Sequence, residues 1–292
     1  MFDGVIVALV TPFRADGSID LAALGELVER SIAARVTGLV PCGTTGESAT
    51  LTHDEHRDVI AAVVKRARGR VKVIAGTGSN NTAEAVALTR FAQEAGADGA
   101  LVITPYYNRP SQEGLYRHFR AVAEAAPIPV VLYDVPSRTA CRLEPETAAR
   151  LDPVRNIVAI KDASGSLETV SRLRAATRLA VLAGDDALTL PSLALGAVGV
   201  VSVAANVVPE ECVEMVSRFR SGDARGALEI HDRLFPLFRA LFVETNPVPV
   251  KTALRLLGRG TGTVRLPLAP LAEANEARLR AVLSEGGWLG AR

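Results

Sequence analysis

Lys161 is the residue of this sequence best placed for covalent chemistry. It follows the apolar run at 157–160 and is one of only four lysines in a chain of 292 residues rich in arginine. A lysine that has lost its proton can form a Schiff base with a carbonyl compound, whereas an arginine cannot. Because apolar surroundings favour the neutral amine, we interpret Lys161 as a nucleophile. The alternative is a structural lysine paired with Asp162.

Hydroxyl and guanidinium groups follow other apolar runs of the chain. Tyr133 and Tyr107 have the chemistry to relay protons to and from a bound carbonyl, with Thr44 bridging them. Arg138 offers a fork of donors that matches a carboxylate. The segment GTTG at 43–46 offers backbone N–H groups and hydroxyls to a small carboxylate. The plainer interpretation of each tyrosine is a core residue whose hydroxyl group is hydrogen-bonded, and that of Arg138 is a surface ion pair.

Motifs for metals and nucleotides are incomplete. His53 and His56 are three residues apart, but HExxH is absent and no third ligand is evident in the sequence. The GTTG segment lacks the GK[ST] ending of a phosphate-binding loop, and residues 76–78 lack the third glycine of a dinucleotide fingerprint. We therefore expect neither a metal nor a cofactor.

Eight short apolar runs would position these side chains. Most lack the in-and-out alternation of a half-solvated strand, which is typical of parallel strands covered on both faces. Eight strands alternating with helices in about 200 residues favour an α/β fold, a closed (β/α)8 TIM barrel, over an open doubly wound sheet. The active site of such a barrel lies at the carboxyl ends of its strands. The runs are 5–10, 38–42, 71–75, 100–103, 129–133, 157–160, 180–183 and 199–203.

Helical patterns separate these runs and continue after the last one. Thr52 and Glu55 form a capping-box pattern, Asn81 followed by Glu84 begins another helix in a similar way, and Ser111 is expected to cap a third. Beyond the barrel, predicted at 1–223, residues 224–292 are expected to form a small C-terminal helical domain with helices at 224–242, 247–258 and 270–284. The uncharged segment 187–209 is interpreted as a buried helix and strand, with a membrane span as a remote alternative.

The composition excludes several classes of function. The chain is 48% hydrophobic with a formal net charge of +1, which indicates neither a nucleic-acid nor a membrane partner. Three cysteines without a CxxC pair favour a reducing compartment, and the N-terminus lacks the basic region of a signal peptide. We therefore expect a cytoplasmic protein.

Several motifs in a fixed order resemble a known family. They are GTTGE (43–47), YDVPSRT (133–139), KDASG (161–165), GDDA (184–187) and NPVPVK (246–251). With these motifs the chain resembles the dihydrodipicolinate synthase / N-acetylneuraminate lyase family. The resemblance implies a class I aldolase without a metal, in which Lys161 forms an imine with pyruvate.

The resemblance also implies roles for individual residues. Ser137-Arg138-Thr139 points to the synthase branch, in which Arg138 would hold the carboxylate of aspartate semialdehyde and the product would be 4-hydroxy-tetrahydrodipicolinate. Thr44, Tyr107 and Tyr133 match the family's proton relay, with Tyr107 reaching in from an adjacent subunit. Thr45 matches a contact to the pyruvate carboxylate, and Val203 a backbone contact to pyruvate. Asp134 stands where asparagine is commoner.

A second set of residues matches the site at which L-lysine inhibits some family members. The resemblance therefore implies feedback inhibition by L-lysine. The plainer alternatives are that the histidines lie on a solvated helix start and that Glu84 only caps its helix. The matching residues are Ser48, Ala49, His53, His56, Asn80, Glu84 and Tyr106.

The expected assembly is a homotetramer, a dimer of dimers, in the biosynthesis of lysine and diaminopimelate. Two other functions stay open at this point. One is another pyruvate aldolase or a keto-sugar-acid dehydratase of the same family, from which the loop at Arg138 is expected to differ. The other is a barrel without catalysis that binds an effector, which the set of Lys161, Tyr133 and Thr44 opposes.

Overall fold

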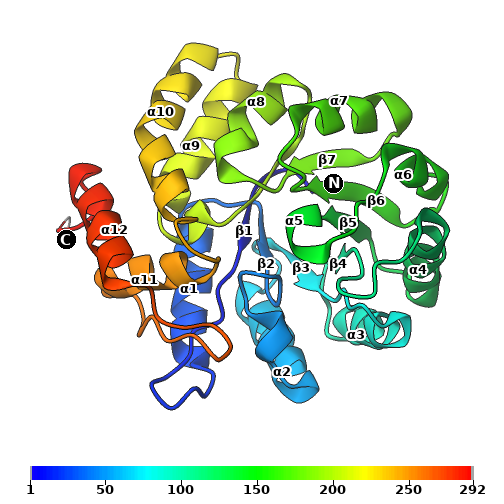
Figure 1. Ribbon diagram of the computed structural model, residues 1–292, viewed down its shortest axis with the longest axis horizontal. Helices are drawn as coiled ribbons and strands as arrows, with labels where there is room; N and C mark the ends of the chain where they lie inside the picture. The colour runs from blue at the N-terminus through cyan, green and yellow to red at the C-terminus, as the bar shows by residue number, and fades with distance from the viewer. Residues whose placement is uncertain (1, 291–292) are drawn as a thin grey trace.

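Eight parallel strands form a closed barrel in the computed structural model, which describes residues 2–290 (Figure 1). The strands pair in chain order and β8 pairs back with β1, so the sheet has no free edge. The predicted (β/α)8 barrel is confirmed over the open sheet. The strands are β1 (Gly4–Ala8), β2 (Gly38–Val40), β3 (Lys72–Gly76), β4 (Gly99–Ile103), β5 (Val130–Asp134), β6 (Ile157–Asp162), β7 (Ala180–Ala183) and β8 (Gly199–Ser202).

All eight apolar runs of the sequence coincide with strands of the barrel. Strand β6 extends two residues beyond its apolar run, so Lys161 lies inside the strand instead of after it. There Lys161 is the register partner of Tyr133 on β5, and Asp162 is the partner of Asp134. Register partners in a parallel pair point to the same side of the sheet, so Lys161 and Tyr133 share one face and the two aspartates the other.

Helices cover the outside of the barrel between successive strands (Figure 1). Thr52 and Glu55 form the predicted capping box, and Ser111 accepts a hydrogen bond from Gly114 N at the next predicted start. Asn81 caps its helix through Ala83 N, but Glu84 turns instead to His53 and Ser79. The helices are α1 (Leu21–Ala33), α2 (His53–Ala67), α3 (Thr82–Glu94), α4 (Gln112–Ala125), α5 (Pro136–Thr139), α6 (Pro145–Leu151), α7 (Leu167–Ala176), α8 (Thr189–Ala194) and α9 (Pro209–Arg220), with short 3-10 turns η1 (Ser48–Thr50), η2 (Asp186–Leu188) and η3 (Ala204–Asn206).

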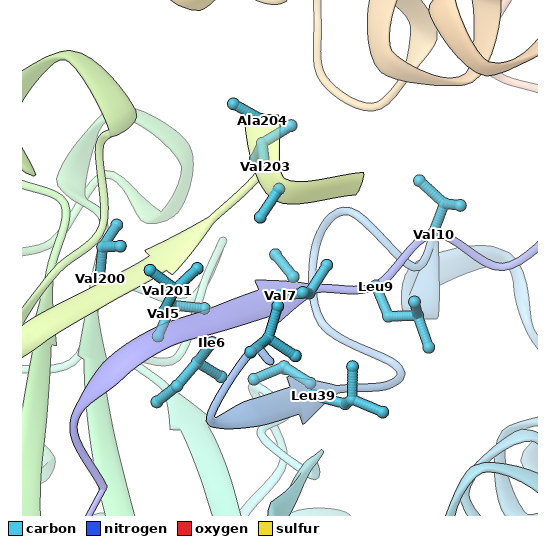
Figure 2. Packing of buried hydrophobic residues seen from close by; sticks show 14 of the residues in the cluster. Val5, Ile6, Val7, Leu9, Val10, Leu39, Val200, Val201, Val203 and Ala204 are labelled. Atoms are coloured by element: carbon cyan, nitrogen blue, oxygen red, sulfur yellow. The ribbon is translucent and has the colours of Figure 1, made fainter. Parts of the chain in front are cut away.

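The core is built from small aliphatic side chains on both faces of the strands. Figure 2 shows Val5 and Ile6 of β1 beside Val200 and Val201 of β8, where the barrel closes. These four residues are at most 2% exposed. Each buried aliphatic side chain contributes roughly 1.5–3 kcal/mol relative to an exposed one, which explains why the strands are continuous apolar runs.

Three further helices follow the barrel, the first packed against α9 and the last in contact with the other two (Figure 1). They are α10 (Ala224–Ala240), α11 (Val248–Leu256) and α12 (Glu273–Glu285), in agreement with the three helices expected there. The division into two domains at 223/224 stays a prediction, and residues 1, 291 and 292 lie outside the described part. The uncharged segment forms η2, α8 and β8, as interpreted. Within residues 2–290, no helix is both long and apolar enough to cross a membrane.

Candidate active site

Lys161 and Tyr133 lie side by side at the carboxyl ends of β6 and β5. The two residues are 5% and 6% exposed, and Lys161 Nζ lies 4.1 Å from the centroid of the Tyr133 ring. Burial and this contact hold the amine in a fixed place beside the phenol, an arrangement suited to use of the lysine as a nucleophile. The Tyr133 ring therefore borders Nζ, the atom to which a carbonyl compound would become bound.

A cavity of about 520 Å3 opens at this rim of the barrel. Thr44, Tyr133 and Arg138 line it, so three of the expected substrate residues share one hollow. Lys161, Thr45 and Val203 are not part of its lining and are each at most 5% exposed. Six of the seven expected effector residues line the same cavity, and they are Ser48, Ala49, His53, His56, Glu84 and Tyr106.

Asn246 links two of the expected substrate contacts, and the sequence alone gave it no individual role. Its side-chain Nδ2 donates to Thr45 Oγ1 at 3.0 Å, and its backbone oxygen accepts from Arg138 Nη2 at 3.0 Å. Arg138 lies on the single turn α5, which begins with Pro136 directly after β5. Asn246, which lies just before α11, therefore links the GTTGE segment to the turn that carries Arg138. Its place in the NPVPVK motif was the only sequence signal.

The GTTGE segment is held close to the end of β3. Gly76 lies so near that a Cβ atom at this position would be 2.2 Å from the backbone oxygen of Cys42, so only glycine fits there. Glu47 N donates to Thr44 O at 3.1 Å and closes the segment into a turn. Thr44 is thereby presented to the cavity, while Thr45 is buried under Asn246.

Two carboxyl groups lie on the opposite face of the strands from Lys161. Asp134 is 1% exposed, and burial, with a smaller contribution from the nearby Asp162, raises the pKa of this carboxyl to about 7 against the lowering effect of the hydrogen bond from Leu143 N. Its Oδ1 accepts a hydrogen bond from Leu143 N at 2.9 Å. Burial also raises the pKa of Asp162. The two carboxyl groups therefore lie next along their strands to Tyr133 and Lys161, on the opposite face of the sheet.

The expected effector residues form a polar wall at the open side of the cavity. His53 Nε2 lies 2.5 Å from Glu84 Oε1, and the Ser79 hydroxyl donates to the other oxygen of this carboxylate, which lowers the pKa of Glu84. His56 is buried, and its Nε2 donates to Gly76 O at 2.7 Å. Burial lowers the pKa of His56, so this histidine is a neutral group in the wall.

Besides Lys161, Thr45 and Val203, two further expected residues are not part of the cavity lining of their own chain. The side chain of Asn80 is not part of the lining, and its backbone oxygen accepts from Asn108 Nδ2 at 2.9 Å. Tyr107 is 90% exposed and has a φ of 72°, a left-handed backbone that is unusual for an aromatic residue. The structure thus brings Thr44, Tyr133 and Lys161 together but does not bring Tyr107 to them within one chain. Among residues 2–290, no group of three or more His, Cys, Asp or Glu side chains is arranged to hold a metal ion.

Fold and site together define a class: a (β/α)8 barrel enzyme with a buried lysine against a tyrosine at its carboxyl rim. The chain belongs to the dihydrodipicolinate synthetase family, whose model matches residues 1–286. It is 58% identical over 288 residues to the 4-hydroxy-tetrahydrodipicolinate synthase of Methanothrix thermoacetophila, covering 98% of this chain and 97% of the relative.

Solved structures of the same family have the same fold. The DHDPS of Cyanidioschyzon merolae, solved with lysine bound, is 44% identical with a TM-score of 0.96, covering 99% of both chains. The dihydrodipicolinate synthase of Acinetobacter baumannii, solved in complex with pyruvate, is 43% identical with a TM-score of 0.96, covering 98% of this chain and 99% of the other. The similarity extends over barrel and C-terminal helices alike.

Proposed function

We propose that this chain condenses pyruvate with L-aspartate 4-semialdehyde to 4-hydroxy-tetrahydrodipicolinate, in the biosynthesis of lysine and diaminopimelate. The observation that carries the proposal is the buried Lys161–Tyr133 contact beside a cavity lined by Thr44 and Arg138. The 58% identity to a 4-hydroxy-tetrahydrodipicolinate synthase and the pyruvate-bound relative support the choice of substrates.

The reaction starts with the neutral amine of Lys161. Its nitrogen attacks the keto carbon of pyruvate, and loss of water gives an imine. Loss of a methyl proton converts the imine into an enamine, whose carbon attacks the aldehyde and forms the new C–C bond. The amino group of the added substrate then displaces the lysine nitrogen by transimination, which closes the ring and frees Lys161.

Hydroxyl groups at the rim would move the protons of these steps. Tyr133 lies against Lys161 and is placed to donate to the departing water and to take the methyl proton, with Thr44 in the same cavity as the relay. Thr45 and the backbone of Val203 would hold pyruvate. Arg138 would bind the carboxylate of the aldehyde substrate through its fork of donors.

Tyr107 supports an assembly of more than one chain. An aromatic residue that is 90% exposed and directed away from its own cavity is suited to complete the relay of a neighbouring subunit. We accordingly place it in the active site of a partner within a homotetramer built as a dimer of dimers. Its exposed ring would then be buried between two chains, where apolar burial stabilises the contact.

The open side of the cavity is proposed as an L-lysine site. Glu84 offers a carboxylate to the effector's ammonium groups, with Ser48, Ala49, His53 and His56 around it and Tyr106 and Asn80 at the border. The lysine-bound structure from Cyanidioschyzon merolae supports this choice of effector. The site shares its cavity with Thr44, so an occupant changes the surroundings of the relay.

Trapping of the imine is the direct test. Incubation with pyruvate and borohydride should add a reduced pyruvyl group to Lys161, detected by peptide mass spectrometry. An adduct elsewhere, or none, would contradict the mechanism. Condensation with aspartate semialdehyde then separates this reaction from those of other pyruvate aldolases, while release of pyruvate from sialic acid without condensation would place the chain in the lyase branch.

A further inference from the structure

A buried ion pair joins the C-terminal helices to the GTTGE segment. Lys251 on α11 places its Nζ 2.5 Å from Glu47 Oε1, and the two side chains are 3% and 1% exposed. The ring of Phe13 lies against both cations, 4.0 Å from Lys251 Nζ and 4.4 Å from the guanidinium carbon of Arg265. Among the ion pairs formed by residues 2–290, it is the one with both partners almost fully buried.

Arg265 binds the same short segment at two points. Its backbone N–H donates to Glu47 Oε2 at 3.1 Å, so both carboxylate oxygens of Glu47 are held by the C-terminal part of the chain. Its guanidinium donates to Thr50 O at 2.9 Å and pairs with Glu55 at the start of α2. Glu47, Lys251 and Arg265, here called the Glu47 cluster, therefore fix the segment from Glu47 to Thr50 from one side.

The backbone at Glu47 needs such support. Its φ of 53° and ψ of 37° are left-handed, a conformation that is strained for a residue with a side chain. A non-glycine residue stays in this region when the surrounding structure determines its conformation. Three residues earlier, Thr44 O accepts from Glu47 N, so the turn that presents Thr44 is closed by this same residue.

Packing alone does not account for a buried ion pair at this place. Removing two charges from water costs nearly as much as their attraction returns, and apolar residues of similar size often replace such pairs without loss of stability. What an ion pair adds is a defined direction and separation between two elements. Here the elements are α11 and the segment that bears Thr44 and Thr45, two expected contacts of the reacting molecule.

We propose that the Glu47 cluster is a positioning device that holds Thr44 and Thr45 in register with Lys161, acting through these residues and not on the substrate. The inference rests on the proposed function, because Thr44 and Thr45 receive their roles there. Its consequence is that the C-terminal helices take part in catalysis by fixing the rim, although their helical side chains are distant from the chemistry. A displacement of about 1 Å at such a position can lower a rate by about 100-fold.

Three variants test this role: Lys251→Met, Glu47→Gln and the double variant. Rates are normalised to the number of sites that borohydride labels with pyruvate, so that unfolded protein does not count. Each single variant should lower kcat through Thr44 and raise the KM for pyruvate through Thr45, with kcat/KM falling about 10- to 100-fold. Lys72→Met is the matched control, since Lys72 pairs with Asp98 at the opposite end of the barrel strands and should keep kcat/KM.

The double variant separates positioning from stability. Removing both charges should return the thermal midpoint towards that of the unsubstituted protein, because no unpaired charge is left buried. The kcat/KM per labelled site should nevertheless stay low. Recovery of kcat/KM together with the midpoint, or unchanged kinetics in folded single variants, would overturn the proposal. Absence of any pyruvate adduct in the unsubstituted protein would instead overturn the proposed function and this inference with it.

Discussion

The two sides of the rim cavity differ in exposure and in how their polar groups are held. On one side Lys161 and Tyr133 are almost fully buried and in contact with each other. On the other side the side chain of His53 is 65% exposed and pairs with Glu84, which is 31% exposed. The buried side excludes water from an amine, whereas the open side keeps charged groups within reach of solvent.

This difference matches two kinds of chemistry. Covalent catalysis needs an amine and hydroxyls in fixed positions out of bulk water, which burial provides. Reversible binding of a charged amino acid needs groups that exchange water for the ligand at little cost, which partial exposure provides. One cavity therefore has a side suited to reaction and a side suited to regulation, and the variants below test this division.

Lys161→Arg should have the largest effect. Arginine keeps the positive charge but cannot form an imine, so condensation should fall by at least about 1,000-fold and borohydride should label no residue. The assay is product formation by purified protein, with the peptide map as a second measurement. Lys65→Arg, at an exposed position on α2, is the control and should keep full labelling. Substantial condensation activity in Lys161→Arg would contradict the assignment of covalent catalysis to the buried side of the cavity.

Arg138→Met should separate the two substrates of the proposed reaction. Loss of charge-assisted hydrogen bonds of about 1.5–3 kcal/mol should raise the KM for aspartate semialdehyde roughly 10- to 100-fold. Pyruvate labelling of Lys161 should continue, because that step precedes the aldehyde. Steady-state kinetics with each substrate varied in turn give the answer. An equal rise in both KM values would mean that Arg138 only supports the loop through Asn246.

Glu84→Gln should act on the open side. Without the carboxylate, inhibition by L-lysine should weaken roughly 10-fold, the loss of about 1.4 kcal/mol from one charged contact. Titration of each variant with L-lysine, relative to its own uninhibited rate, measures this effect. Glu124→Gln, which alters an exposed pair with Arg120 on α4, should keep the original inhibition. A flat response of the unsubstituted protein to L-lysine would remove the regulatory role of this side.

Asp134→Asn should have the smallest and most pH-dependent effect. The pKa of this carboxyl is about 7 in the folded protein against 3.8 without burial, so the folded state holds a proton that the unfolded chain lacks between these pH values. Stability should therefore fall as pH rises from about 4 to about 7, by at most about 4 kcal/mol. Urea unfolding of Asp134→Asn should lack this fall, whereas the exposed Asp58→Asn should retain it. Parallel pH curves for all three proteins would contradict the assignment.

The barrel was predictable because its determinants are local. A strand covered on both faces is a continuous apolar run, as 100–103 and 180–183 are, and eight such runs of similar spacing leave few other topologies. Capping boxes such as that of Thr52 are equally local. The position of Lys161 at the rim follows from the strand that carries it, whereas its substrate came from the family resemblance.

The long-range contacts that hold the site together were not predictable from the sequence. Asn246 meets Thr45 across 201 residues, and Lys251 meets Glu47 across 204. No periodicity predicts such contacts, because they join parts of the chain that only the folded barrel brings together. The raised pKa of Asp134 likewise comes from burial, which depends on everything packed around it.

By itself the sequence determined the order of strands and helices and the residue types that carry the chemistry. The tertiary structure alone decided that substrate and effector residues share one cavity, that Tyr107 points out of its own chain, and that the C-terminal helices hold the rim through Glu47. The physical reason is the sequence separation over which each interaction acts. Secondary structure follows from neighbours within a few residues, while ion pairing and desolvation depend on parts of the chain that only folding brings together.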